Sequence, residues 1–152
     1  MKINDILPNG TDITAREYSP LTLAFIGDGV YELFVRSRIV GHTNAPAGKL
    51  HKLCVKYVKA GAQAEAMKAI MDILTEEEMW IYKRGRNAKS PTVPKNADVT
   101  EYRLATGFEA LIGYLYLEGR ETRIAELCKI SMEAIEKEQI QNTNQDNRKH
   151  VL

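Results

Sequence analysis

The 152-residue sequence predicts an all-α fold of about six or seven helices around one hydrophobic core. In most segments, apolar residues recur every three or four positions, which is the spacing of one helix face. The alternating apolar and polar pattern of a half-buried strand is missing from the chain. A hydrophobic fraction of 44% and a charged fraction of 27% are typical of a folded domain and exclude a wholly disordered chain.

The first predicted helix extends from Ser19 to Gly41. The Ser19 side chain can accept a hydrogen bond from the first N–H groups of this helix. Pro20 suits the first helical position, because the N–H that proline lacks has no helical partner there. Gly41 is a typical helix terminator.

Two amphipathic helices follow, and we expect them to be joined near Gly61. Asn44 is the expected N-cap of the first helix, with Pro46 in its first turn. The apolar positions of both helices follow a period of 3.6 residues. They are Leu50, Leu53, Cys54, Tyr57 and Val58 in the first helix and Ala66, Met67, Ile70 and Leu74 in the second.

A short helix is predicted over 76–84. Thr75 and Glu78 have the spacing of a capping box, in which each side chain bonds the backbone N–H of the other residue. Gly85 is the expected end of this helix. The segment 87–97 that follows is basic and interrupted by prolines, so we expect a loop with a functional role.

Two longer helices complete the prediction. Asp98 is the expected cap of a helix that stops at Gly119, and the last helix spans about 120–138. Residues 139–152 are almost entirely polar, so we expect a disordered tail. The folded domain is therefore expected to cover residues 1–138.

The composition also excludes several classes of protein. Two cysteines, Cys54 and Cys128, are too few for a disulfide framework and lack the spacing of a zinc site, so we expect both to be buried apolar side chains. The apolar runs fall far short of the roughly 18 residues of a membrane span, and the N-terminus lacks the pattern of a signal peptide. We therefore expect a soluble cytoplasmic protein without membrane contact.

Charge is distributed unevenly along the chain. Residues 1–32 hold 2 basic and 5 acidic side chains, whereas residues 33–103 hold 13 basic and 7 acidic ones. A basic middle with carboxylates elsewhere is common in enzymes that cut nucleic acid with a metal ion. A solvated charged surface explains the same distribution, so charge alone leaves both interpretations open.

Two carboxylates occupy apolar helical surroundings. Asp28 lies between Gly27 and Gly29 in the middle of the first predicted helix, and Glu109 stands within a long apolar run. Burying a carboxylate is unfavourable unless a polar group or a cation compensates. Carboxylates on two helices can hold Mg²⁺, which supports phosphodiester hydrolysis, whereas a surface kink at Asp28 is the simpler alternative.

The residues around these carboxylates resemble a known family. Residues 23–33, LAFIGDGVYEL, resemble the signature helix of ribonuclease III, and residues 108–113, FEALIG, resemble its second acidic motif. The similarity is greatest to the Mini-ribonuclease III subfamily, which has the catalytic domain without a double-stranded-RNA-binding domain. It covers about residues 18–138, including the basic segment 83–89.

The resemblance implies a homodimeric, Mg²⁺-dependent endoribonuclease that cuts double-stranded RNA during maturation of large-subunit (23S) ribosomal RNA. The products would carry 5′-phosphate and 3′-hydroxyl ends. It also implies that Asp28 and Glu109 are the metal ligands and catalytic residues. The alternative is a helical RNA-binding or ribosome-assembly module that has kept the fold and lost the activity.

The sequence departs from the family pattern at two acidic positions. Ala24 stands where the pattern has a Glu four residues before Asp28, and Thr106 stands where it has an Asp three residues before Glu109. One well-held Mg²⁺ is therefore expected, with a second ion depending on the substrate. Thr106 either orients a water on the ion or is an ordinary packed side chain.

RNA binding would have to come from the same domain. The best candidates for backbone contacts lie in the basic segment, because A-form RNA is recognised mainly through phosphates and 2′-hydroxyls. They are Arg84, Arg86 and Lys89, followed by Lys95 and Arg103. A lysine stripe on the second predicted helix either follows duplex phosphates or is simply solvated; it comprises Lys49, Lys52, Lys56 and Lys59.

The dimer implied by the resemblance has a candidate seam in the first predicted helix. Phe25, Ile26 and Val30 surround Gly27 and Gly29. Small glycines between apolar side chains suit a close helix–helix contact across a two-fold axis.

Overall fold

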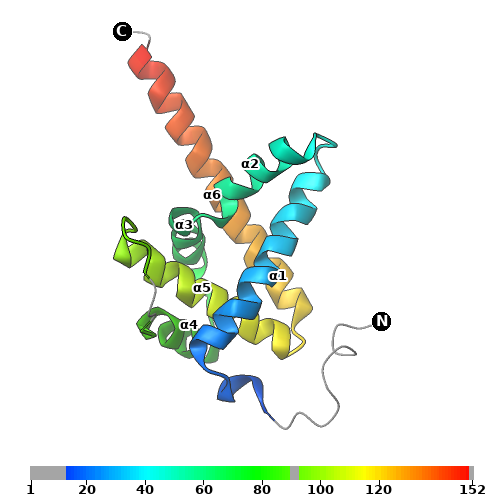
Figure 1. Cartoon of the computed structure of the whole chain (residues 1–152), viewed down its shortest axis with the longest axis vertical. Helices are drawn as coiled ribbons and strands as arrows, with labels where there is room; N and C mark the ends of the chain where they lie inside the picture. The colour runs from blue at the N-terminus through cyan, green and yellow to red at the C-terminus, as the bar shows by residue number, and fades with distance from the viewer. Residues whose placement is uncertain (1–12, 90–92, 151–152) are drawn as a thin grey trace.

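The computed structural model describes residues 13–89 and 93–150. Within these ranges the chain forms six α-helices and no strand, which confirms the all-α class. Figure 1 shows the helices in chain order. Their bounds are Pro20–Val40 (α1), Ala47–Val58 (α2), Ala60–Ile70 (α3), Glu76–Asn87 (α4), Val99–Leu117 (α5) and Glu121–His150 (α6), with short 3-10 turns at Ala15–Glu17 (η2) and Met71–Ile73 (η3).

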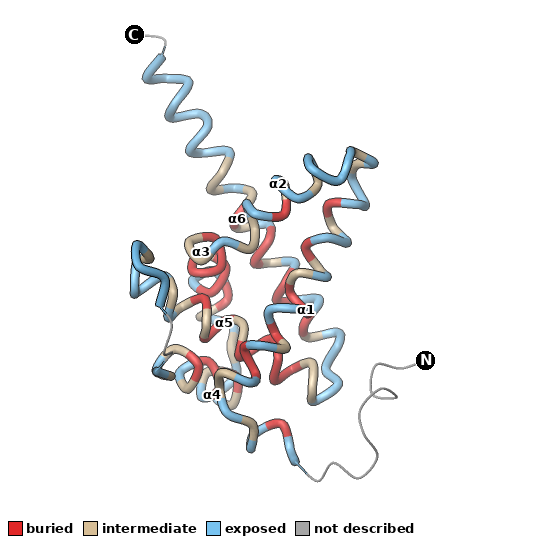
Figure 2. The backbone as a smooth tube through the Cα atoms, in the orientation of Figure 1, coloured by how far each residue is buried: buried red, intermediate tan, exposed pale blue. Residues whose placement is uncertain are grey.

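Helix α5 is the centre of the fold. It packs along α1 and also contacts α3 and α4, while α3 packs in turn against α6. Figure 2 shows that buried residues concentrate where these helices meet. In this core the rings of Tyr31 and Phe108 meet edge to face, with centroids 4.9 Å apart. The Tyr31 hydroxyl donates a hydrogen bond of 3.1 Å to the carbonyl oxygen of Tyr57, so the polar end of this buried side chain is satisfied.

Helices α1 and α5 meet at two glycines. A Cβ on Gly27 would overlap the carbonyl oxygen of Glu109, and a Cβ on Gly113 would overlap the carbonyl oxygen of Leu23. Both obstacles are backbone atoms, so only a shift of a whole helix could make room. Because Asp28 follows Gly27 directly, this contact also determines where Asp28 lies relative to Glu109.

This contact shows that part of the predicted dimer seam packs within the chain instead. Gly27 makes its close approach to α5 of the same chain. Val30 is buried in the core, and Ile26 is partly buried against it. Phe25 alone of the three apolar side chains is largely exposed, at 83%. A repeat of small and apolar residues indicates close packing, but it does not reveal whether the partner helix belongs to the same chain.

Most predicted helix ends are confirmed. Ser19 accepts a hydrogen bond from the Thr22 N–H, at 3.2 Å. Thr75 and Glu78 form the capping box at the start of α4. The Asp98 side chain accepts bonds from the first N–H groups of α5. Gly119 adopts a φ of 74°, which a residue with a side chain rarely adopts.

Two predicted boundaries are wrong, and the break predicted near Gly61 lies two residues earlier. Helix α2 begins directly after Pro46 rather than at Asn44. The break between α2 and α3 falls at Lys59, whose backbone is extended, and Gly61 lies inside α3. Helix α4 continues through Gly85. A glycine is needed at this position because α5 passes close to it: a Cβ there would come within 2.9 Å of backbone and side-chain atoms of α5.

The end of the last helix also differs from the prediction. Helix α6 continues past Glu138 to His150, so the expected disordered tail is helical over 139–150. Glu121–His150 contains neither Gly nor Pro, and a helix that has already formed extends readily through polar residues. This end of α6 projects away from the other helices (Figure 1) and is almost fully exposed (Figure 2). The assignment of the functional domain to residues 1–138 stays a prediction.

Two further predictions concern the cysteines and membrane-spanning helices. Cys54 and Cys128 are both buried and unpaired, as expected. None of the helices in the described part of the chain is long and apolar enough to cross a bilayer.

The glycine contact predicts the effect of two substitutions. We expect Gly27→Ala to destabilise the fold by about 3 kcal/mol or more, because its methyl group collides with the α5 backbone. Gly48→Ala is the matched control: nothing lies within 4 Å of its Cβ, so it should stabilise α2 by up to about 1 kcal/mol. Urea unfolding measures both effects. Equal stabilities of Gly27→Ala and the unmodified protein would contradict the close approach.

Candidate active site

Asp28 and Glu109 form an acidic pair between α1 and α5. Asp28 is exposed and Glu109 is half-buried. Burial is the main cause that raises the pKa of Glu109 to about 8, and the negative charge of Asp28 raises it further. The structure therefore brings together the two carboxylates that the sequence singled out, near enough for each charge to oppose the other.

Glu32 adds to the negative charge of the pair. It lies one turn beyond Asp28 on α1, and the pKa of Asp28 is raised first by burial and then by the Glu32 charge. Glu32 itself accepts a hydrogen bond of 2.7 Å from Arg36. The sequence interpretation missed Glu32, although its spacing of four residues from Asp28 places both on one side of a helix.

Gln63 on α3 is a buried polar residue that affects Glu109 of the acidic pair. Its side chain is only 3% exposed, and its interaction with Glu109 lowers the pKa of that carboxyl against the larger effect of burial. The sequence interpretation missed this residue too. The signal was present, because Gln63 precedes Ala66, Met67 and Ile70 on one apolar face, where a polar side chain is as anomalous as Asp28 or Glu109.

The two positions that depart from the family pattern, Ala24 and Thr106, add no charge to the acidic pair. Ala24 is buried, one turn before Asp28. Thr106 is partly buried, and its hydroxyl donates a hydrogen bond of 3.0 Å to the carbonyl oxygen of Tyr102. The lone pairs of that hydroxyl stay able to accept, so a role for Thr106 in orienting a water remains a prediction.

Three of the predicted RNA-binding residues line one hollow, which we call the basic hollow. Arg86, Lys89 and Arg103 surround a cavity of about 360 Å³ together with Thr106. Thr106 lies one turn before Glu109 on α5, so the basic hollow adjoins the helix that carries the acidic pair. Lys95 is exposed on the segment that leads into α5, and residues 90–92 of the same loop lie outside the described part of the chain.

Arg84 lies elsewhere. Its guanidinium donates hydrogen bonds to the carbonyl oxygens of Arg16, at 3.2 Å, and Tyr18, at 3.5 Å. It also stacks over the Trp80 ring, 4.8 Å from the centroid. Arg84 thus holds the segment before α1 against α4, and the structure does not bring it into the basic hollow.

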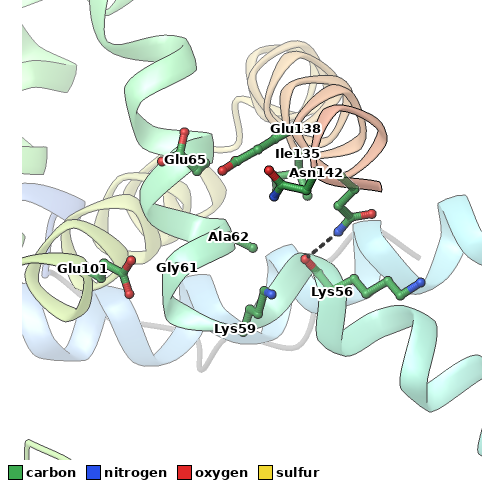
Figure 3. A pocket seen from close by; sticks show the side chains of 10 residues that line it. Lys56, Lys59, Gly61, Ala62, Glu65, Glu101, Ile135, Glu138 and Asn142 are labelled. Carbon is green, nitrogen blue, oxygen red and sulfur yellow. Dashed lines mark hydrogen bonds between the residues drawn. The ribbon is translucent and has the colours of Figure 1, made fainter. Parts of the chain in front are cut away.

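The lysine stripe lies on the exposed side of α2, where Lys49, Lys52 and Lys56 all reach solvent. Figure 3 shows a second hollow beside it, of about 210 Å³, which combines Lys59 with the carboxylates of Glu65, Glu101 and Glu138. The Lys56 side chain points away from this hollow, while its carbonyl oxygen accepts a bond of 3.3 Å from Gln139. The exposure of these lysines is compatible with both interpretations of the stripe, contact with a polyanion or a solvated surface.

The described residues contain no group of three or more His, Cys, Asp or Glu side chains that could hold a metal ion. At the acidic pair, Asp28 and Glu109 offer two carboxylate ligands, and an ion there could take its other ligands from water or substrate. This is the coordination that Mg²⁺ commonly adopts in proteins.

Comparisons with known proteins find consistent similarity. The pattern of the ribonuclease III domain matches residues 21–120. A Mini-ribonuclease 3 from Thermoanaerobacter sp. (strain X514) is 57% identical over 118 residues, which cover 78% of this chain and 83% of that protein. One from Staphylococcus aureus (strain NCTC 8325 / PS 47) is 46% identical over 123 residues, covering 80% and 92%. A crystal structure of a Fusobacterium nucleatum protein matches with a TM-score of 0.71 and 36% identity, covering 78% and 94%.

The raised pKa of Glu109 predicts how stability depends on pH when divalent ions are removed. Between its ordinary value of 4.5 and about 8, folded Glu109 holds a proton that the unfolded chain has released. Its contribution to the free energy of unfolding therefore falls as pH rises through this range. Glu109→Gln removes the effect, so its stability relative to the unmodified protein should rise from pH 5 to pH 8. Urea unfolding in EDTA measures the difference; a difference independent of pH would contradict the raised pKa.

Proposed function

Because this chain belongs to the Mini-ribonuclease III group of the ribonuclease III family and is therefore an endoribonuclease, we propose that it cuts double-stranded RNA with Mg²⁺ held by Asp28 and Glu109. The acidic pair is the observation that carries this proposal. The non-catalytic alternative is set aside, because the relatives that share most of the chain are ribonucleases.

The residues of the acidic pair fit a divalent cation. Two neighbouring carboxylates, one exposed and one half-buried, are stabilised by a positive charge between them, and without one the raised pKa of about 8 keeps Glu109 protonated at neutral pH. The buried Oε1 of Gln63 accepts no hydrogen bond in the described part of the chain, and waters carried by a hydrated ion are donors. Oxygen ligands in small number are what Mg²⁺ prefers.

The proposed reaction is hydrolysis of a phosphodiester bond, leaving 5′-phosphate and 3′-hydroxyl ends. A bound Mg²⁺ would stabilise charge on the phosphate and lower the pKa of the attacking water. Asp28 is exposed, so RNA can reach the pair from solvent, whereas Glu109 is half-buried. With Ala24 and Thr106 in place of two carboxylates, we expect one firmly held ion at each site.

We propose that the basic hollow binds the RNA backbone beside the acidic pair. Arg86, Lys89 and Arg103 provide three cations around Thr106, and Lys95 lies on the segment leading to the same helix. The lysine stripe of α2, with Lys49, Lys52 and Lys56, is the second candidate. Arg84 is the weakest candidate, because backbone carbonyls already accept from its guanidinium.

A homodimer is proposed from the exposed side of α1. Phe25 is 83% exposed and Leu33 is 61% exposed, and Gly29 lies between them with open space where a Cβ would be. Residues four apart lie on one helix face, so these three form an uncovered stripe that is apolar at both ends. A second copy of the chain would cover the stripe, and each protomer would cut one strand of the duplex.

The proposed role in the cell is cytoplasmic maturation of large-subunit (23S) ribosomal RNA. This role rests on family membership, since the relatives share most of their length with this chain. The duplex segments of a ribosomal RNA precursor are substrates of the proposed class.

Substitutions in the acidic pair test the proposed chemistry. Asp28→Asn and Glu109→Gln should each reduce cleavage of a long RNA duplex in Mg²⁺ by at least about 1000-fold, because each removes a charged ligand of the ion. The helical circular dichroism should not change. Asp146→Asn, on the exposed end of α6, is the control and should cleave normally. Substantial cleavage by either site variant would remove that residue from the mechanism.

Salt dependence tests the RNA track. Replacing Arg86, Lys89 and Arg103 by Ala should weaken duplex binding and reduce the slope of log affinity against log salt by about two to three units, at roughly 0.9 per phosphate contact. The saturated cleavage rate should change much less, since the acidic pair is intact. Lys129→Ala on α6 is the control. An unchanged slope in the triple variant would shift the assignment to the lysine stripe.

The oligomeric state tests the apolar stripe. Phe25→Ser should convert a dimer into a monomer while leaving the core intact, because this side chain is exposed in the single chain. Light scattering after size exclusion measures the mass. Val99→Ser, a change at another exposed apolar residue, should keep the dimer. If the unmodified protein is a monomer, or Phe25→Ser stays dimeric, the proposed interface is wrong.

A further inference from the structure

Trp80 on α4 is in contact with two guanidinium groups. The Arg16 guanidinium lies 4.6 Å from the centroid of the ring, and the Arg84 guanidinium lies 4.8 Å from it. Both distances are within the roughly 6 Å of a cation–π contact. The ring is also 42% exposed, although tryptophan is highly buried on average in folded proteins. We call these three residues the Arg–Trp patch.

Arg84 holds the patch together. Its guanidinium donates hydrogen bonds to the carbonyl oxygens of Arg16, at 3.2 Å, and Tyr18, at 3.5 Å. These bonds fix the segment that carries Arg16 against α4. Two of the five N–H donors of Arg84 are occupied in this way, so its main effect is to determine where Arg16 lies.

Arg16 is the cation of the patch that stays available to a ligand. It is exposed, and it makes no hydrogen bond or ion pair with another residue in the described ranges. The nearby acids do not neutralise it: Glu17 accepts a hydrogen bond from the Thr14 N–H, and Glu76 lies at the N-terminus of α4, where the helix dipole favours a negative charge. Contact with the Trp80 ring thus restrains the Arg16 guanidinium while its N–H groups remain free to donate.

The Arg–Trp patch and the basic hollow lie on different sides of α4. Arg84 and Arg86 are two residues apart, which places their side chains about 200° apart around a helix of 3.6 residues per turn. Arg86 lines the basic hollow, whereas Arg84 belongs to the patch. A helix with its side chains is about 10 to 12 Å wide, so the two groups of cations are separated by about that distance. Both strands of a duplex carry phosphates, so one RNA can contact both groups.

We propose that the Arg–Trp patch is a second contact for the RNA backbone, in which the Arg16 guanidinium binds a phosphate. The inference rests on the proposed cleavage of double-stranded RNA. A guanidinium can bind phosphate oxygens through two parallel N–H bonds, and one that is already restrained loses less conformational freedom on binding. The same charge would attract an acidic protein segment, but RNA is favoured because this chain is an endoribonuclease with further cations one helix width away.

The first measurement is the affinity for a fluorescently labelled RNA duplex at several salt concentrations, in EDTA so that no Mg²⁺ supports cleavage. Arg16→Gln should weaken binding about 8-fold at 0.1 M salt and reduce the slope of log affinity against log salt by about 0.9, the value for one phosphate contact on duplex DNA. Arg16→Lys keeps the charge and should retain the slope. Arg148→Gln, which removes an exposed arginine at the end of α6, is the control and should also retain it.

The second measurement needs no substitution, because Trp80 is the only tryptophan of the sequence. Its fluorescence is quenched with acrylamide in the presence and absence of saturating duplex. Bound RNA should shield the exposed part of the ring and lower the quenching constant by at least about twofold. Poly-glutamate, which offers carboxylates in place of phosphates, is the control and should leave the quenching constant unchanged.

The outcomes distinguish this inference from the proposed function. An unchanged salt slope in Arg16→Gln, or unchanged quenching of Trp80 at saturating duplex, would overturn the proposal while leaving RNA binding elsewhere on the chain intact. Protection by poly-glutamate but not by the duplex would also overturn it, and would assign the patch to an acidic protein segment. If the unmodified protein does not bind the duplex, the proposed action on double-stranded RNA is wrong and this inference fails with it.

Discussion

The backbone contact between α1 and α5 determines the rest of the structure. Gly27 faces the carbonyl of Glu109, and Gly113 faces the carbonyl of Leu23, so the two helices are fixed against each other at both points. A glycine inside a helix costs about 1 kcal/mol relative to alanine, and the close packing of α1 against α5 offsets that cost. The same contact places Asp28, the neighbour of Gly27, beside the residue whose carbonyl Gly27 touches. The position of the acidic pair therefore follows from the packing.

The electrostatics of the site follow from that position. Burial and the Asp28 charge raise the pKa of Glu109 to about 8, so the protein without an ion holds a proton there at neutral pH. The interaction with Gln63 opposes this shift. A divalent cation would replace the proton and neutralise both carboxylates, which links ion binding to proton release. Arg86, Lys89 and Arg103 line the basic hollow with Thr106, one helical turn before Glu109 on α5, and are proposed to provide positive charge for the RNA backbone.

The sequence predicts those features that depend on local chemistry. Ser19, Thr75 and Asp98 cap helices as expected, because a cap involves only neighbouring residues. Asp28 and Glu109 were found because a charge within an apolar run is anomalous. Gln63 was missed because an uncharged amide among alanines attracts less notice, although the argument from helix periodicity is the same. Gly85 was expected to end a helix, because the residues around it in the sequence do not show that α5 packs closely against it.

Proton release upon ion binding tests the link between packing and chemistry most directly. Titration calorimetry with Mn²⁺ at pH 7, repeated in buffers of different ionisation enthalpy, gives the number of protons released for each ion bound. With a Glu109 pKa of about 8, we expect the release of about one proton in the unmodified protein and much less in Glu109→Gln. Mn²⁺ binding to the unmodified protein without proton release would show that the ion does not replace a proton on Glu109, and would contradict the proposed site.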